Sequence, residues 1–222
     1  MANKRVVVIG GGPAGHDAAT YAARFGAEVT LIEREIVGGA AHLRDCVPSK
    51  SMIATGGALS FARRLDGMGL ANVETGVDAE HLRARIQGIE QRLEQSVTQL
   101  LTSQGVTIHR GTGRLLGPHE VCVDTSNGVV ELTADAIVLA TGSRPRIPEW
   151  APIDRERVLT TRDAYPPEQL PEHLVVVGSG VTGVEFVHMF ASLGSEVTLI
   201  VSRQQVLPQK DPEAAALLEQ NF

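Results

Sequence analysis

Two clusters of glycine are the feature of this chain whose spacing predicts chemistry. The first cluster holds Gly10, Gly12 and Gly15, and the second repeats the same spacing with Gly178, Gly180 and Gly183. In a G-x-G-x-x-G turn the first glycine permits a tight bend, the second lets a pyrophosphate approach the backbone, and the third lets helix and strand pack closely. N–H groups at the start of the following helix hold the phosphates. Each cluster therefore predicts a dinucleotide site.

The residue at the end of the next strand distinguishes the two sites. Glu33 follows Gly15 by 18 residues, where a carboxylate accepts hydrogen bonds from ribose hydroxyls. In the second copy Val201 takes its place, and no acid occurs from there to Gln205. A carboxylate would repel a 2′-phosphate, whereas Arg203 either offers it a charge-assisted bond or is a solvated loop residue. The second site is therefore predicted to accept NADPH, while a preference for it and the use of NADH are both left open.

A repeat must position these residues. Residues 5–34 and 173–202 align without a gap, and Glu28–Ile32 falls on Glu196–Ile200. Each copy begins with a β-branched run that predicts a buried parallel strand, and the glycine turn then opens a helix that leads to a second strand. Each copy is therefore predicted to be a right-handed βαβ unit.

The residues between and after the copies follow other patterns. Helical spacing predicts a long helix over 78–104, and Asn127-Gly128 between short apolar runs predicts a hairpin. A buried strand is expected at 136–140 and a linker over the proline-rich residues 143–172. A further helix is expected from Asp211. Because one strand, one helix and one strand cannot close a doubly wound sheet, we expect the chain to be part of a longer protein.

Composition excludes several classes of partner. The formal net charge of −6 and the sequence pI of about 5.6 argue against nucleic-acid binding. No apolar run approaches the roughly 18 residues of a membrane span, and no signal peptide precedes the first strand. Cys46 and Cys122 are too few for a secreted disulfide framework. We expect a cytoplasmic protein, and no metal site is predicted.

Three segments together carry a family resemblance: IGGGPAG with the ERE that follows, GGAAHLRDCVPSK at 38–50, and IVLATGSRPR at 137–146. They resemble the pyridine nucleotide–disulfide oxidoreductases, flavoproteins that include dihydrolipoamide dehydrogenase, glutathione reductase and soluble transhydrogenase. The resemblance implies an α/β fold, with a Rossmann-like FAD-binding domain with a β-meander insertion at 1–150. It also implies the start of a second Rossmann-like, NAD(P)-binding domain at 151–222. The full-length protein would be a homodimer whose remaining part supplies a His–Glu pair.

The resemblance also implies which residues bind the cofactors. The FAD residues would be Gly10, Gly12, Pro13, Ala14, Gly15, Glu33, Arg34, Gly39, Ala40, Lys50, Gly113, Ala140, Thr141 and Gly142. The NAD(P) residues would be Gly178, Ser179, Gly180, Val181, Thr182, Gly183, Glu185, Val201, Ser202 and Arg203. Lys50 would lie by the flavin ring and pair with Glu185, on the first turn of the second copy's helix. The alternatives are a solvated surface lysine and a carboxylate that stabilises a helix N-terminus.

One motif of the family is incomplete in this chain. Disulfide reductases carry Cys-x4-Cys before Pro-Ser-Lys, but here Ala41 stands at the first position and only Cys46 remains. Since Cys122 lies on the predicted hairpin, no dithiol relay is expected. Cys46 is either a small buried residue beside the flavin or a single redox thiol that cycles through sulfenic acid. His42 is either a proton donor to a reduced quinone or a polar loop histidine.

The pattern GGAAxLxDCVPSK resembles the cysteine-deficient NAD(P)H:quinone reductases. The leading hypothesis is therefore an FAD-dependent oxidoreductase that passes hydride from NAD(P)H to flavin and then directly to a quinone. The alternatives are a dihydrolipoamide dehydrogenase-like enzyme, a transhydrogenase, a peroxide reductase that uses Cys46, and a non-enzymatic flavin-binding scaffold. Catalytic roles are expected for Lys50, Glu185 and Cys46, and the 222 residues alone are expected to be inactive.

Overall fold

The computed structural model describes residues 3–65, 68–69 and 75–222. The chain divides into two compact units, one made of Met1–Pro48 with Gln87–Ala164 and the other of Ser49–Ile86 with Tyr165–Phe222. Within the described part of the chain, no helix combines the length and the apolarity needed to cross a membrane.

The first unit is built on the expected βαβ repeat. Strand β1 (Arg5–Ile9), helix α1 (Pro13–Arg24) and strand β2 (Glu28–Glu33) follow one another, and β1 pairs in parallel with β2. The short strand β6 (Ala136–Leu139) lies parallel on the other side of β1. The six strands have the order β5-β4-β3-β2-β1-β6, so the α/β prediction is confirmed.

The predicted meander forms the other end of this sheet. Strand β3 (Thr107–Gly117) starts parallel to β2 and continues as the antiparallel partner of β4 (Glu120–Thr125), which pairs with β5 (Gly128–Thr133). The hairpin predicted at Asn127-Gly128 is confirmed, because Gly128 takes a φ of +120° there. Such a positive φ is the conformation that favours glycine in tight hairpin turns.

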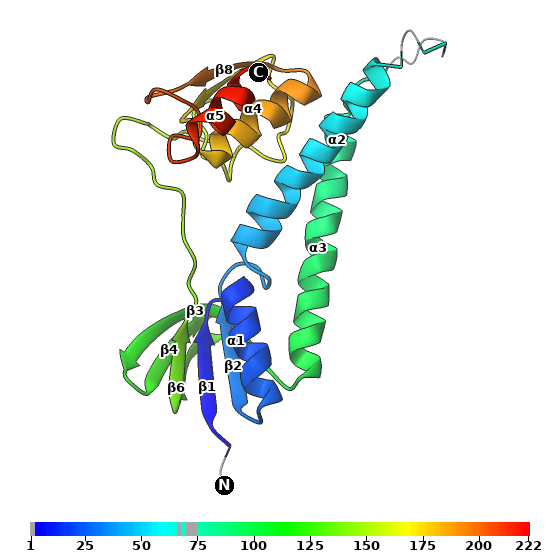
Figure 1. Cartoon of the computed structure of the whole chain (residues 1–222). Coiled ribbons are helices and arrows are strands. Elements are labelled where there is room, and N and C mark those ends of the chain that lie inside the picture. Colours follow the sequence, from blue (N-terminus) through cyan, green and yellow to red (C-terminus); the bar gives the residue numbers. More distant parts are fainter. Residues whose placement is uncertain (1–2, 66–67, 70–74) are drawn as a thin grey trace. The chain divides into compact units, whose positions relative to one another are not determined.

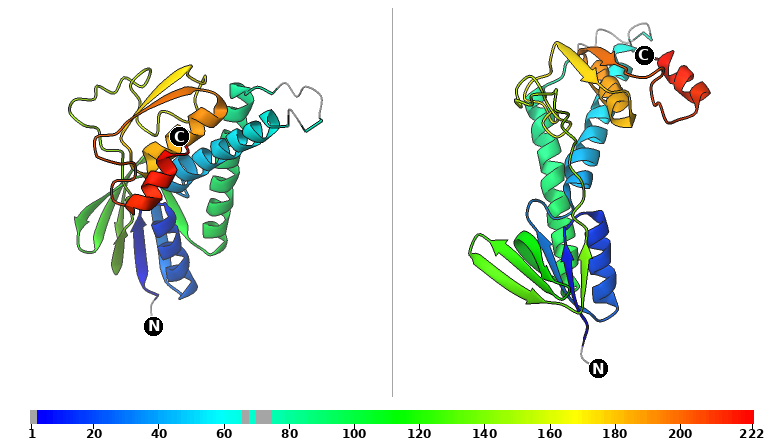
Figure 2. Two further views of the ribbon diagram at one scale, coloured as in Figure 1. Left: turned by 45° about the horizontal axis from the view of Figure 1, so that its top comes forward. Right: turned by 90° about the vertical axis from the view of Figure 1, so that its left-hand side faces the viewer.

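The two faces of the sheet have different coverings (Figures 1 and 2). On one face Val8 and Leu31 pack with Ala19 of α1 and with Leu101 of helix α3 (Ala79–Ser103), which confirms the long helix predicted at 78–104. On the other face Val7, Ile9 and Ile32 pack with Val121 and Val123 of β4. Because strand residues alternate between faces, one run of valine and isoleucine serves both cores.

The sequence pattern did not predict the helix after the first repeat. A π-helical turn, Ala41–Cys46, leads directly into helix α2 (Val47–Arg63). Pro48 lies at the junction of the two segments and lacks the backbone N–H that would bond back into the π-helical turn. Gly56 and Gly57 lower the helix propensity of the segment, which obscured its helical pattern.

The second unit repeats the βαβ arrangement. Strand β7 (His173–Val177), helix α4 (Val181–Leu193) and strand β8 (Glu196–Ile200) follow one another, with β7 and β8 parallel. Helix α5 (Pro212–Glu219) starts after Asp211, as expected. Residues 140–172 hold no helix or strand, which agrees with the predicted linker.

Strand β7 is less buried than the sequence predicted. The exposed fractions of Val175 and Val177 are 50% and 57%, whereas β1 in the first copy is buried at its last three residues. Among the described residues the sheet that contains β7 has two strands, and helix α4, whose buried side chains include Phe186 and Phe190, contacts both of them. One face of β7 therefore stays open, and the prediction of a buried strand is wrong for the second copy.

Candidate functional site

The first glycine turn joins β1 to α1 through a backbone that other residues cannot adopt. Gly10 has a φ of +106°, and a Cβ there would lie 2.1 Å from the carbonyl oxygen of Ala140. A Cβ on Gly15 would lie 1.8 Å from the carbonyl oxygen of Gly10. The first glycine is therefore required for the turn and the third for close packing of helix and strand.

The second turn has the same backbone. Gly178 has a φ of +110°, and a Cβ on Gly183 would lie 1.9 Å from the carbonyl oxygen of Gly178. The residues that cap the two helices also match, because Gly12 has φ −71° and ψ −177° while Gly180 has φ −70° and ψ −178°. The repeat seen in the sequence is therefore a repeat of local structure.

The start of α1 fits a diphosphate. Gly12 caps the helix and has no side chain that could accept a hydrogen bond. The first N–H groups of the helix are therefore available to a ligand. Gly39 approaches so closely that its Cβ would lie 2.3 Å from the Cα of Gly12. Two glycine backbones thus form a cradle that side chains would fill, which is the shape that a pyrophosphate needs.

Glu33 is held by the backbone at the end of β2. Its Oε2 accepts a hydrogen bond from the N–H of Gly11, and its Oε1 accepts one from the N–H of Glu35, each at 2.7 Å. A carboxylate oxygen has more than one acceptor site, so both oxygens can still receive ribose hydroxyls. The geometry therefore supports the ribose-binding role expected for Glu33.

A cavity of about 330 Å³ lies at this turn. That volume is within the roughly 300–1,000 Å³ range of ligand pockets. The expected FAD residues in its wall are Gly10, Gly12, Pro13, Ala14, Glu33, Arg34, Gly39, Ala40, Ala140, Thr141 and Gly142. Gly113 lines a smaller neighbouring cavity, whereas Gly15 is buried in the packing of α1. The structure thus brings together most of the residues that the sequence singled out for FAD.

Six residues of this wall were not among the expected FAD residues, namely Glu35, Ala41, Leu139, Ser143, Arg144 and Arg162. Ser143, Arg144 and Arg162 line the same cavity. Ser143 and Arg144 directly follow the Ala140–Gly142 turn, so their position in the chain was a usable signal. Arg162 lies in the proline-rich segment, where no periodicity or motif indicated that its side chain would reach the site.

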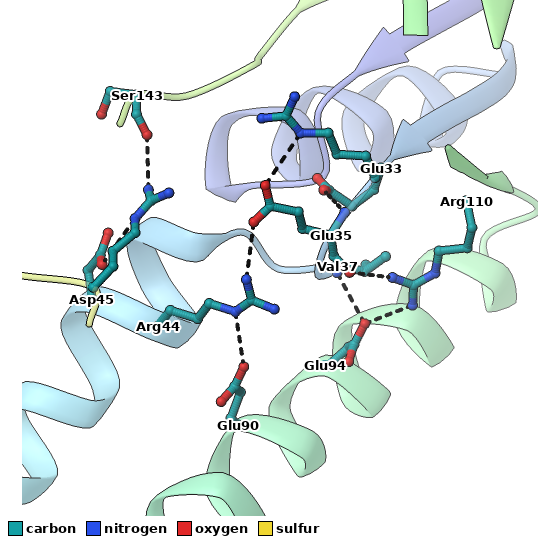
Figure 3. Close-up of polar contacts among 11 residues, drawn as sticks. Glu33, Glu35, Val37, Arg44, Asp45, Glu90, Glu94, Arg110 and Ser143 are labelled. Carbon is teal, nitrogen blue, oxygen red and sulfur yellow. Dashed lines mark hydrogen bonds and ion pairs between the residues drawn. The ribbon is translucent and has the colours of Figure 1, made fainter. Parts of the chain in front are cut away.

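Ion pairs fix the loop that follows β2 (Figure 3). Arg44 Nη1 lies 3.1 Å from Glu35 Oε2, and Arg44 Nε lies 3.4 Å from Glu90 Oε1 on α3. Arg110 Nη2 donates to Glu94 Oε1 at 2.8 Å. These pairs are partly exposed, so each contributes about 0–1 kcal/mol, and their role is to set the position of the loop that carries Glu35.

The second unit has a cavity of about 350 Å³ at its glycine turn. Its wall contains the expected residues Ser179, Gly180, Val181, Ser202 and Arg203, together with Leu207, Pro208, Gln209 and Lys210. The N–H of Leu207 donates to the carbonyl of Ser179 at 2.7 Å, which ties the loop after β8 to the glycine turn. Among the described residues no acid lines this cavity, and Lys210 adds a second cation that the sequence did not single out.

The remaining expected NAD(P) residues lie away from that wall. Gly178, Thr182, Gly183, Glu185 and Val201 do not line the cavity. The first and third glycines shape the turn, as described above, and Val201 is the residue directly after β8.

Lys50 and Glu185 form an ion pair in the second unit. Lys50 Nζ donates to Glu185 Oε1 at 2.8 Å, and the two side chains are 52% and 36% exposed. Helix α4 has no acid in its first turn, so the prediction that placed Glu185 there is wrong by one residue. The alternative of a carboxylate that stabilises the helix N-terminus is correspondingly weakened, because the dipole effect falls off within that turn.

The π-helical turn holds Cys46, four residues before Lys50 in the chain. In a π-helix residues five apart are joined by hydrogen bonds, so Ala41 and Cys46 occupy the two ends of one turn. Cys46 is exposed, so the description of it as a small buried residue is wrong for this structure. His42 lies on the same turn and is exposed, so the loop position expected for it is also wrong.

Cys122 lies apart from this chemistry, on strand β4. It is buried, and Arg114 Nη2 lies 3.6 Å from its Sγ. Arg114 also donates to both oxygens of Asp124, and this hydrogen bonding lowers the pKa of the Asp124 carboxyl below its ordinary value. Cys122 therefore lies beside the ion pair of Arg114 and Asp124.

Comparisons with known proteins agree with this geometry. The family described as pyridine nucleotide-disulphide oxidoreductase matches residues 4–222. An NAD(P)H dehydrogenase (quinone) of Mycobacterium tuberculosis is 40% identical over 98% of this chain and 47% of its own length. A dihydrolipoyl dehydrogenase of Bacillus subtilis is 33% identical over 98% of this chain and 48% of its own length.

Solved structures give the same result. The crystal structure of LpdA from Mycobacterium tuberculosis superimposes with a TM-score of 0.89 and 38% identity, over 99% of this chain and 49% of that one. The chain thus spans about half the length of the relatives it matches. With the family profile matched over nearly all residues and both dinucleotide turns formed, the chain belongs to the pyridine nucleotide-disulphide oxidoreductase family of FAD- and NAD(P)H-dependent flavoproteins.

Proposed function

We propose that the protein is an FAD-dependent NAD(P)H oxidoreductase that reduces a quinone-type acceptor directly from the flavin, without a redox-active disulfide. The observation that carries this proposal is the π-helical turn, which has Ala41 at one end and Cys46 at the other. A dithiol relay needs two neighbouring thiols, and this turn supplies one. The name of the 40% identical relative, NAD(P)H dehydrogenase (quinone), supports the same acceptor class.

The residues of the first unit would bind FAD in a fixed orientation. The backbone cradle at Gly12 and Gly39 would hold the diphosphate, and Glu33 would hold the adenosine ribose. FAD, when bound, supplies reversible two-electron redox chemistry. We propose that the Lys50–Glu185 pair serves the hydride transfer, in which Glu185 holds the ammonium group where negative charge develops.

The second unit would bind the nicotinamide coenzyme, and its charges favour NADPH. Arg203 and Lys210 line a cavity whose described wall contains no acid, and Ser202 adds a hydroxyl donor. A 2′-phosphate gains charge-assisted hydrogen bonds from such a wall. We expect the double substitution of Arg203→Gln and Lys210→Gln to raise the dissociation constant of NADP+ about tenfold or more and to leave that of NAD+ within about twofold. Equal weakening of both coenzymes would reject this NADPH preference.

Further parts of the proposal concern the whole protein. We propose that residues 1–150 act as the FAD-binding domain and residues 151–222 as the beginning of the NAD(P)-binding domain. We also propose a cytoplasmic homodimer that uses a small-molecule acceptor. These proposals follow from the family resemblance.

Anaerobic reduction followed by a panel of acceptors tests the function. The flavin-loaded, full-length protein is reduced with NADPH or NADH, and reoxidation is followed at the flavin absorbance with a naphthoquinone, lipoamide, an NAD+ analogue or hydrogen peroxide. The proposal predicts the fastest reoxidation by the quinone. Faster reoxidation by lipoamide would reject it, whereas reoxidation by the NAD+ analogue alone would indicate a transhydrogenase. Loss of peroxide turnover in Cys46→Ser would identify the single-thiol alternative.

A further inference from the structure

Three arginines line the cavity at the first glycine turn, and their surroundings differ. Arg34 lies with its Nε 3.4 Å from Glu35 Oε1 and is 44% exposed, and Arg144 is exposed. Arg162 has only a quarter of its side chain exposed. It is therefore the arginine of this wall whose position the protein fixes most closely.

Two partners from separate segments of the first unit hold Arg162. Its Nη2 donates to the carbonyl oxygen of Ser143 at 2.9 Å, and its Nε lies 3.6 Å from Oδ1 of Asp45. Figure 3 shows both partners, with Ser143 in the loop after β6 and Asp45 on the π-helical turn. One guanidinium thus bridges the two segments between which the cavity opens.

The hydrogen-bonding capacity of this guanidinium is only partly used. Arg162 Nε is buried and faces Asp45 Oδ1 at 3.6 Å, so this ion pair occupies one side of the guanidinium. Nη1 makes no hydrogen bond to a described residue, and Nη2 has a second N–H beside the one that it donates to Ser143. Arginine has five N–H donors, and buried donors without partners are rare in folded proteins. An anion in the cavity would supply the missing acceptors.

We propose that Arg162 is an FAD-binding residue, whose guanidinium contacts the diphosphate, and that Asp45 positions it for this contact. The inference rests on the proposed binding of FAD at the first glycine turn. The backbone cradle beside Gly12 places the diphosphate in the same cavity that Arg162 lines. The diphosphate is the anionic part of FAD, and arginine binds phosphate oxygens through two parallel N–H donors.

The proposal is tested by titrating the apoprotein with FAD at low and at high salt and measuring the quenching of flavin fluorescence. Arg162→Met is expected to bind FAD about 10- to 100-fold more weakly and with a smaller dependence on salt, because it removes charge-assisted bonds. Arg162→Lys should recover part of the affinity. Arg157→Met, whose side chain is exposed and lies outside the wall of this cavity, is the matched control and should stay within about threefold of the parent chain.

A double-mutant cycle tests the role of Asp45. Asp45→Asn is expected to weaken FAD binding about threefold to tenfold in the parent chain and to have no further effect in Arg162→Met. An equal effect in both backgrounds would reject the positioning role. A soluble Arg162→Met with native circular dichroism and parental FAD affinity would overturn the whole inference. Failure of the parent chain itself to bind FAD would instead reject the proposed cofactor site.

Discussion

Replacement of Glu33 by Gln tests whether the carboxylate at the end of β2 organises the FAD site. The Glu33 side chain accepts the N–H of Gly11 through Oε2 and the N–H of Glu35 through Oε1. Glutamine has nearly the same shape but only one acceptor oxygen, and its NH2 group must face the other N–H. The substitution therefore removes one hydrogen bond and leaves the glutamine NH2 group facing a backbone N–H, so that two donors oppose each other.

The size of the effect follows from these two contacts. A hydrogen bond to a charged group contributes about 1.5–3 kcal/mol, and about 1.4 kcal/mol corresponds to a tenfold change in affinity. We therefore expect the dissociation constant of FAD to rise about 10- to 150-fold in Glu33→Gln. Because Gly11 belongs to the glycine turn itself, part of this loss comes from the looser loop and part from a weaker bond to the ribose.

Titration of the apoprotein with FAD, monitored by flavin fluorescence, measures this change. Glu28→Gln is the matched control, since Glu28 lies at the other end of the same strand and is exposed. It should bind FAD with the affinity of the parent chain. If Glu33→Gln binds FAD within about threefold of the parent, then the carboxylate neither orders the turn nor contacts the ribose, and the assignment is refuted.

Two further predictions concern packing and titration. A Cβ on Gly56 of α2 would lie 2.0 Å from Ser192 Oγ of α4, so Gly56→Ala should cost about 1–3 kcal/mol in urea unfolding, and Ser192→Gly should restore most of this loss. The control Gly57→Ala, whose Cβ would meet no atom within 4 Å, should stabilise the helix by about 0.5–1 kcal/mol. A hydrogen bond from His81 to Asp78 raises the pKa of His81 above its ordinary value of 6.5. Its stabilising contribution is therefore complete below pH 6.5 and is lost as the pH rises through the raised pKa. An NMR titration should show this pKa return toward 6.5 in Asp78→Asn, and an unchanged pKa would contradict the pairing.

The regular elements were predictable where the sequence repeats. The gapless match of residues 5–34 with 173–202 correctly identified β1, α1 and β2 and their counterparts in the second unit. The Asn127-Gly128 pair between two short apolar runs also identified the hairpin. Helix α2 escaped prediction because two adjacent glycines interrupt its pattern. The burial of β7 could not be read from its residues, because burial depends on which elements cover a strand.

Site residues could be predicted where they lie at a fixed distance along the chain from a recognisable motif. Glu33 was recognisable because its distance from the glycine turn is fixed by one helix and one strand. Arg162 and Lys210 lie in segments without regular structure, and they reach their cavities through particular loop conformations. The loop that carries Lys210, for example, passes through Leu207 at a φ of +48°. A positive φ at a leucine is not indicated by composition or spacing.

The two copies of the repeat show how one backbone gives two sites. Their glycines share φ values within a few degrees, so the phosphate-binding turn itself does not distinguish one dinucleotide from another. The difference lies just after the second strand of each copy. There the first copy has Glu33, fixed by two N–H groups, and the second has Arg203 and Lys210 without an acid. We propose that this reversal of charge beside an unchanged cradle directs a 2′-hydroxyl to one site and a 2′-phosphate to the other.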